Sequence, residues 1–175
     1  VHVACGVETP TEERDIRAHG FQLHVLPLRR SSASPMETLR LLSRLAAVMR
    51  GVRPDVVHLV ALKPILLGGL VARWFRVPRV VAAFSGLGFV FTGSGPRARM
   101  SRAILMLLFR AALGGTRCRA IFQNDDDRGV FERAGILRAE QIVMVRGVGV
   151  DLKRFRPTAE LPPPVAVLFP ARILR

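Results

Sequence analysis

The sequence predicts an α/β domain with a doubly wound parallel sheet. Short apolar segments alternate with helix-like segments along almost all of the 175 residues. The strand-like segments are continuous apolar runs instead of an alternation of polar and apolar residues, which is typical of strands buried on both faces. Such sheets bind ligands beyond the carboxyl ends of their strands. The loops at those ends are therefore the first places to look for a site.

Two helices near the start of the chain are marked by capping residues. Thr9-Pro10-Thr11-Glu12 supplies an N-cap, a proline at the first helical position and a capping-box glutamate, and this helix stops at Gly20. Ser34-Pro35-Met36-Glu37 repeats the pattern, and Gly51 closes the second helix. Apolar runs predict three strands in this part of the chain, at Val1–Cys5, Phe21–Leu26 and Asp55–Val60.

The rest of the chain continues the alternation. Helices are predicted over 64–75, 97–113 and 125–134, and strands over 79–84, 119–123 and 141–145. A stiff, proline-rich linker is predicted over 157–164. We expect a first domain at 1–156, with its start cut off, and the opening strand of a cut second domain at 165–175.

The composition limits the class of protein. Half of the residues are hydrophobic, which excludes a disordered tail, and the longest charge-free stretch, 80–96, is broken by glycines and does not fit a membrane-spanning helix. The net charge is +14, and almost all of the 27 basic residues are arginines. Nucleic-acid binding is not favoured, because tyrosine is absent and the aromatic residues do not interleave with arginine. An anionic membrane surface or a phosphorylated substrate fits the charge better.

Cys5 and Cys118 have no metal-ligand or CxxC spacing and are predicted to be small buried residues in a reducing compartment. Three adjacent carboxylates at 125–127 suggest a metal at first sight. Consecutive helical residues do not share a face, however, and acidic residues in a first turn complement the helix dipole, so a capping role is favoured. No metal and no cofactor are predicted.

Three loops carry the candidate binding residues. Ser85, Gly86 and Gly88 follow a central strand in a glycine-rich loop whose amide groups could bind an anion, although a plain surface loop is the alternative. Lys63 follows another strand, where it could meet a phosphate or a sugar hydroxyl or simply reach solvent. Asn124, after a third strand, could donate a hydrogen bond to a ligand. His58 lies within a strand and is interpreted as a core histidine.

Several segments together resemble a known family. These are Arg53-Pro54-Asp55-Val56-Val57-His58, the segment Gly147-Val148-Gly149-Val150-Asp151 with Phe155 and Pro157, and Val167-Leu168-Phe169-Pro170-Ala171-Arg172. They are similar to motifs of the retaining GT-B glycosyltransferases of family 4. The residues 62–64, 85–88 and 122–127 resemble the subgroup that adds sugars to polyprenyl-diphosphate-linked saccharides. The resemblance implies a Rossmann-like N-terminal, acceptor-side domain of the GT-B fold, with the glycine-rich loop after the family's first strand missing.

The resemblance also implies roles. Arg172 would hold the diphosphate of a nucleotide-sugar, while the catalytic residues would belong to the second domain, so the present chain alone should be inactive. Ser85 stands where relatives often have a histidine that touches the sugar. The full enzyme would act on a lipid-linked acceptor in surface glycan assembly, at the inner face of a cell membrane.

The helix at 97–113 could contact that membrane. Ala103, Ile104, Leu107, Leu108 and Ala111 can form an apolar face flanked by arginines. An ordinary core helix is the alternative for this segment. For the whole chain, the alternative to an enzyme is a non-catalytic module that binds anionic lipid or nucleic acid. A nucleotide-sugar epimerase of the same architecture would need catalytic carboxylates, which the sequence does not show.

Overall fold

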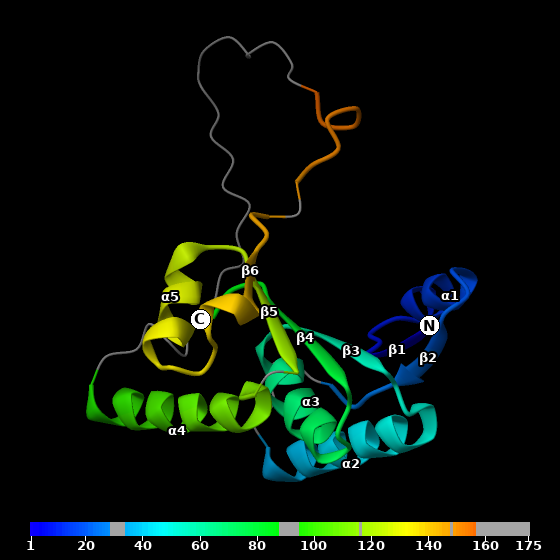
Figure 1. The fold of residues 1–175 in the computed structure, drawn as a ribbon. Coiled ribbons are helices and arrows are strands. Elements are labelled where there is room, and N and C mark those ends of the chain that lie inside the picture. Colours follow the sequence, from blue (N-terminus) through cyan, green and yellow to red (C-terminus); the bar gives the residue numbers. More distant parts are fainter. Residues whose placement is uncertain (29–33, 88–94, 116, 148, 157–175) are drawn as a thin grey trace.

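The computed structural model of the chain describes residues 1–28, 34–87, 95–115, 117–147 and 149–156 (Figure 1). The linker predicted at 157–164 and the strand predicted in 165–175 lie outside these ranges. All the other strands and helices expected from the sequence are present. They are β1 (His2–Cys5), α1 (Pro10–Ala18), β2 (Gln22–Val25), α2 (Pro35–Val52), β3 (Val56–Val60), α3 (Leu62–Trp74), β4 (Arg79–Phe84), α4 (Pro96–Leu113), β5 (Cys118–Phe122), α5 (Asp125–Arg133), the 3-10 turn η2 (Ala139–Gln141) and β6 (Ile142–Met144).

The predicted cap is in place on α1, and Asn124 caps α5, whereas the Ser34 side chain makes no capping hydrogen bond at the start of α2. Thr9 Oγ1 accepts a hydrogen bond from the Glu12 amide at 3.3 Å. Asn124 Oδ1 accepts one from the Asp127 amide at 2.8 Å. Each bond satisfies an amide of the first helical turn, which has no partner inside the helix, and so fixes where the helix begins.

All strand pairs are parallel, as predicted, but they form two sheets. The larger sheet has the order β3-β4-β5-β6, and β1 and β2 form a separate pair. The sequence predicted one continuous sheet. The difference arises between β1 and β3, because no described strand lies there to join them.

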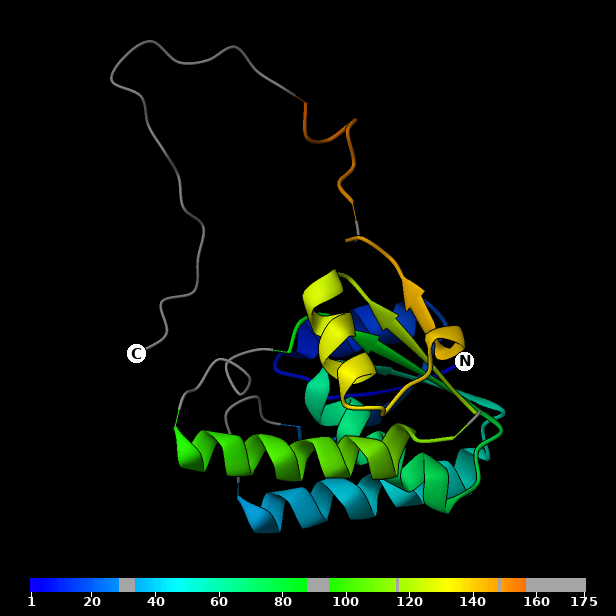
Figure 2. The same cartoon turned by 60° about the vertical axis from the view of Figure 1, so that its left-hand side comes forward.

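The helices cover one face of the larger sheet. In Figures 1 and 2, α2, α3 and α4 lie together on one side of it, and α1 lies away from them, beyond β1 and β2. Gly68 and Gly69 of α3 allow close packing: an added Cβ atom would lie 2.7 Å from Leu59 Cδ2 at Gly68 and 3.0 Å from Ala112 Cβ at Gly69. A side chain at Gly68 would require the end of the Leu59 side chain to move, and one at Gly69 would require Ala112 to shift slightly.

Four phenylalanines form the centre of the core beneath the larger sheet. They come from β4, β5, α4 and α5, and each is at most 1% exposed. Their ring centroids lie 4.6 to 6.0 Å apart in the five recorded pairs, a range typical of aromatic clusters. The cluster consists of Phe84, Phe109, Phe122 and Phe131, and it fixes α4 and α5 against the two central strands.

Candidate functional site

The predicted binding residues that the structure describes lie at one edge of the larger sheet. Lys63 follows β3, Ser85 and Gly86 follow β4, and Asn124 follows β5. These three strands are neighbours and run parallel, with Val60 paired to Ala83 and Phe84 paired to Phe122. Their carboxyl ends therefore face the same edge, and the three loops lie side by side there, as expected for this class of sheet.

Lys63 lies closer to a helix than the sequence suggested. The prediction started the helix at Pro64, but α3 begins at Leu62, so Lys63 is in its first turn. The chain turns sharply between β3 and α3 at Ala61, whose φ is 71°. Proline is tolerated in a first turn because its missing amide would have no helical partner there. The half-buried Lys63 thus adds its charge to the positive N-terminal end of α3.

The loop after β4 is anchored by one buried side chain. Ser85 is exposed, Gly86 has a φ of 128°, and Leu87 is only 4% exposed. Because a φ of this size is rare for residues with a side chain, Gly86 is required for the turn. Gly88, the third predicted residue of this loop, lies outside the described residues.

Asn124 serves as a helix cap in the structure. Besides accepting from the Asp127 amide, its Nδ2 donates to Asp127 Oδ2 at 3.0 Å. One hydrogen of Nδ2 remains for a ligand, so the predicted binding role is compatible with capping. Within the described part of the chain, no group of three acidic, histidine or cysteine side chains could hold a metal ion. Instead, Asp125 forms ion pairs with two arginines: its Oδ1 lies 3.3 Å from Arg128 Nη1, and its Oδ2 lies 3.6 Å from Arg146 Nη2.

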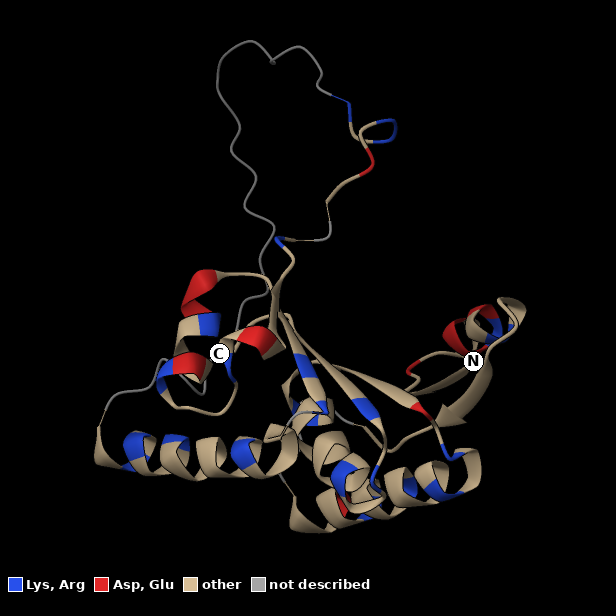
Figure 3. Ribbon diagram, viewed as in Figure 1, with Lys and Arg blue, Asp and Glu red and all other residues tan. Residues whose placement is uncertain are grey.

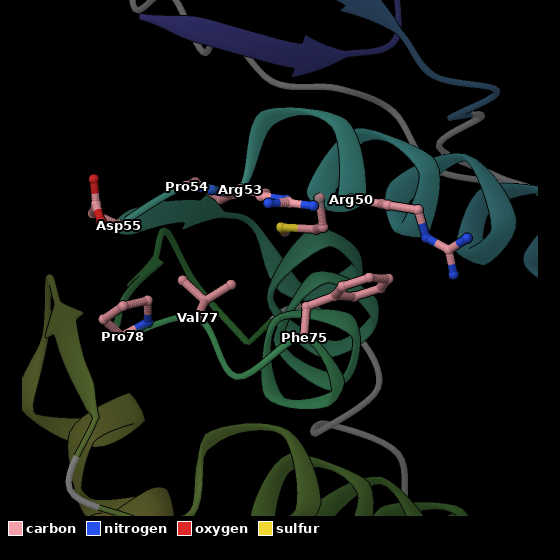
Figure 4. Close-up of a pocket in the computed structure, with 8 residues that line it drawn as sticks. Arg50, Arg53, Pro54, Asp55, Phe75, Val77 and Pro78 are labelled. Carbon is pink, nitrogen blue, oxygen red and sulfur yellow. The ribbon is translucent and has the colours of Figure 1, made fainter.

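A hollow of about 400 Å³ lies at the opposite edge of the sheet, where β3 and β4 begin (Figure 4). Its lining includes Arg50, Arg53 and Asp55, none of which the sequence analysis selected as a site. In Figure 4 the Arg50 and Asp55 side chains point away from each other. The charged groups therefore do not converge on a ligand, and the hollow does not replace the carboxyl-edge site.

Helix α4 has a buried side and an exposed apolar side. Phe109, Ala112 and Leu113 are buried against the core. On the other side, exposed apolar residues recur at helical spacing: Met100 at 65%, Ile104 at 53%, Leu107 at 68% and Leu108 at 39%. Figure 3 shows several basic residues along the same helix. Helix α4 therefore packs on the core along one side, as the alternative of a core helix expects, and has an apolar surface on the other. We name Met100, Ile104, Leu107 and Leu108 the α4 stripe.

The two cysteines differ in their surroundings. Cys118 is buried in β5, and burial raises the pKa of its thiol to about 11 despite the neighbouring Arg119. Cys5 is half-buried, and its thiol pKa is raised to a smaller degree by burial and by the nearby Glu12. The prediction of a buried residue is confirmed for Cys118 and holds in part for Cys5.

Sequence comparison identifies the family of this chain. Residues 1–117 match the family described as "Glycosyl transferase 4-like", and the chain belongs to that family. The resemblance inferred from the motifs is thereby confirmed. Among the described residues, no helix is long and apolar enough to cross a membrane.

Two individual proteins are similar to the chain. The N,N'-diacetylbacillosaminyl-diphospho-undecaprenol alpha-1,3-N-acetylgalactosaminyltransferase of Campylobacter jejuni is 27% identical over 153 residues, which are 86% of this chain and 40% of the relative. The crystal structure of MurG from Acinetobacter baumannii aligns with a TM-score of 0.48 at 16% identity, over 86% of this chain and 37% of that one. The chain thus spans less than half the length of either protein.

Proposed function

We propose that this chain is the acceptor-side domain of an enzyme that transfers a sugar from a nucleotide-sugar to a polyprenyl-diphosphate-linked saccharide. The proposal rests mainly on the position of Lys63, Ser85, Gly86 and Asn124, which lie in loops at the same edge of the sheet. It also rests on the membership of the chain in a glycosyltransferase family. The printed name of the Campylobacter jejuni relative describes transfer to a diphospho-undecaprenol-linked sugar. That name supports an acceptor of the same chemical class.

The residues at the carboxyl edge suit an anionic, hydroxyl-rich acceptor. Lys63 supplies an ammonium group beside the positive end of α3, where a diphosphate or a sugar hydroxyl would be stabilised. Ser85 is exposed and can donate or accept a hydrogen bond. Asn124 can donate one hydrogen bond besides its capping contact. These groups would orient an acceptor without performing chemistry themselves.

The reaction joins the acceptor hydroxyl oxygen to the anomeric carbon of the donor sugar, and the nucleoside diphosphate leaves. We propose retention of the anomeric configuration, as the resemblance implies. Arg172 would bind the departing diphosphate, because a guanidinium donates two parallel hydrogen bonds to such oxygens. The chain alone is proposed to be inactive, with the catalytic groups in a second domain.

The α4 stripe supplies a membrane contact for this enzyme. Its exposed leucine, isoleucine and methionine side chains could enter the interface of a bilayer, while Arg97, Arg99 and Arg110, which are exposed on the same helix, would attract anionic lipids. Such a contact would hold the carboxyl edge near lipid-linked acceptors. We propose a peripheral location at the inner face of the cell membrane on this basis.

The test of the enzymatic proposal is sugar transfer by the complete reading frame to a polyprenyl-diphosphate saccharide, across a panel of nucleotide-sugars. We expect transfer in which the product keeps the anomeric configuration of the donor sugar, as determined by NMR of the product. Lys63→Ala should lower kcat/KM for the acceptor by about 10- to 100-fold, the range for losing one charged contact. Lys153→Ala removes the other lysine of the chain and is the matched control, with no change expected. If no donor supports transfer, the non-catalytic binding module becomes the better account.

The membrane contact has its own test. Binding to vesicles that contain phosphatidylglycerol should exceed binding to phosphatidylcholine vesicles and should weaken in Leu107→Ser. Leu39→Ser is the matched control, because Leu39 of α2 is 62% exposed and Leu107 is 68% exposed. Equal losses in the two variants would contradict a specific role for the α4 stripe.

A further inference from the structure

A second hollow lies at the amino edge of the larger sheet, opposite to the carboxyl edge that holds the candidate acceptor residues. The ends of α3 and α4 and the starts of β4 and β5 form its walls. Its volume is about 370 Å³, which is within the range of small-ligand sites. Core residues such as Val77, Val80 and Leu113, each at most 7% exposed, form part of its lining.

Three arginines also line this hollow. Arg73, Arg76 and Arg117 are exposed, and no acidic residue of the described part of the chain lines the hollow with them. The ion pairs recorded among the described residues involve other arginines. Figure 3 shows basic residues, in blue, on α3, β4 and β5. Because a guanidinium group keeps its charge at all ordinary pH values, the hollow has a permanently positive rim.

The helix ends account for only part of this charge. The carboxyl ends of α3 and α4 lie at the hollow, and each carries roughly half a negative charge from its unpaired carbonyl groups. Arg73 Nη1 donates to the Gly114 carbonyl, just beyond α4, at 2.6 Å. Three guanidinium groups against two helix ends leave an excess of about two positive charges. A phosphate monoester, which carries about 1.5 to 2 negative charges at neutral pH, would balance this excess.

The backbone of Arg76 adds an independent observation. The Val77 amide donates to the Ala72 carbonyl at 2.9 Å, and the Arg76 amide donates to the Arg73 carbonyl at 3.1 Å. These two hydrogen bonds form the Schellman motif, which ends a helix at a residue in the left-handed conformation. Arg76 is that residue, with a φ of 54°. Glycine is favoured at this position, because a Cβ atom makes the left-handed conformation unfavourable.

Other helices of the chain end at glycine in the same turn. Gly20 follows α1 with a φ of 77°, and Gly135 follows α5 with a φ of 60°. An arginine after α3 therefore costs conformational energy that glycine would avoid, and such strain is typical of positions whose side chain has a function. Arg53 at the end of α2 has a φ of 48°, but it lines the neighbouring hollow together with Asp55. Arg53 is thus a natural comparison for Arg76.

We propose that the hollow lined by Arg73, Arg76 and Arg117, here named the arginine hollow, binds a small phosphate monoester. Guanidinium groups donate paired hydrogen bonds to phosphate oxygens. The bond to the Gly114 carbonyl holds Arg73 in place and leaves its other N–H groups for the ligand. Since the hollow is larger than a phosphate ion, the group that bears the phosphate would lie against the core residues of the lining.

The arginine hollow is separate from the proposed acceptor edge. Lys63 is in the first turn of α3, whereas Arg76 follows its last turn. The 13 residues of α3 span about 20 Å, so a small ligand at one end does not reach the other. The present proposal therefore does not depend on the acceptor proposal, and either one could fail alone.

Isothermal titration calorimetry of the complete reading frame with glucose 1-phosphate and AMP tests the proposal. We expect a binding event that Arg76→Gly weakens by about 10- to 100-fold, the range for losing one charged hydrogen-bonding contact. The same variant should not lower the Tm, because glycine suits the left-handed turn. Arg53→Gly makes the same backbone change at α2 and is the matched control, with unchanged binding expected. Lys63→Ala should also leave this event unchanged, which separates it from binding at the acceptor edge.

A second pair of variants leaves the helix turns intact. Arg117→Gln should weaken binding in the same range, whereas Arg119→Gln, which removes an exposed arginine outside the lining, should have no effect. Inorganic phosphate should bind more weakly than the two monoesters, and glucose without a phosphate should not bind. Monoester binding that survives both Arg76→Gly and Arg117→Gln would overturn the proposal. Equal affinities for inorganic phosphate and the monoesters would also overturn it.

Discussion

The two faces of the larger sheet consist of the same strands and differ in what lies against them. On the helix side, Phe84 and Phe122 are at most 1% exposed, whereas on the other side Val56 and Val60 are about half exposed. The residues on both faces are mainly apolar. Burial in this chain is therefore decided by the neighbouring elements more than by the residue types.

The largest expected difference between the two faces is in stability. Phe109→Ala should lower the free energy of unfolding by about 3–5 kcal/mol, because it opens a cavity among four packed rings. Val143→Ala on the uncovered face should cost less than about 0.5 kcal/mol, as is usual at the surface. Urea denaturation of both variants checks the pair. Similar losses would mean that the uncovered face is in fact packed.

A smaller loss of stability is expected at Gln141, a buried residue just before β6. Gln141, 3% exposed, donates from Nε2 to the Gly115 carbonyl at 2.7 Å and to the Cys118 carbonyl at 3.0 Å. Gln141→Leu leaves the buried Cys118 carbonyl and the more accessible Gly115 carbonyl without this donor and should cost about 1–3 kcal/mol in urea denaturation. Glu140→Leu alters an exposed neighbour and should be close to neutral. A neutral Gln141→Leu would mean that water replaces the amide.

A further expected effect on stability depends on pH. The folded thiol of Cys118 has a pKa of about 11, above its ordinary value of 9.0, so between these values the unfolded state has lost more protons than the folded state. Stability should therefore fall as pH rises from 9 to 11, by no more than about 1.4 kcal/mol per unit of pKa difference. Cys118→Ala should remove this slope, measured as the free energy of unfolding against pH. An unchanged slope would assign it to other groups.

Most of the fold could be predicted from the sequence because its signals are local. Capping residues fixed the starts of α1 and α5, and apolar runs located the strands. The start of α3 was predicted two residues late, because Pro64 was taken as the first helical residue although a first turn accepts proline at several positions. Sheet order and continuity depend on contacts between distant segments, which a single sequence does not display.

The candidate site was predictable in position but less so in detail. Strand ends pointed to Lys63, Ser85 and Asn124, and the parallel register brings their loops to one edge. The exposure of His58, which corrects its interpretation as a core residue, could not be predicted, since its valine and leucine neighbours indicate a buried strand whether or not a covering helix is present. Gln141 was assigned only to a strand, because nothing local shows that its amide reaches the carbonyl groups of Gly115 and Cys118. The binding roles of Gly88 and Arg172 stay predictions.

We propose that the carboxyl edge of the larger sheet binds the acceptor. The most direct measurement follows the backbone amide shifts of this chain by NMR during titration with a short-chain polyprenyl-diphosphate saccharide, and separately with nucleotide-sugars. We expect the acceptor to shift the amides of Lys63, Ser85, Gly86 and Asn124, and the nucleotide-sugars to leave them unchanged. Nucleotide-sugars that shift these amides while the acceptor does not would contradict the account.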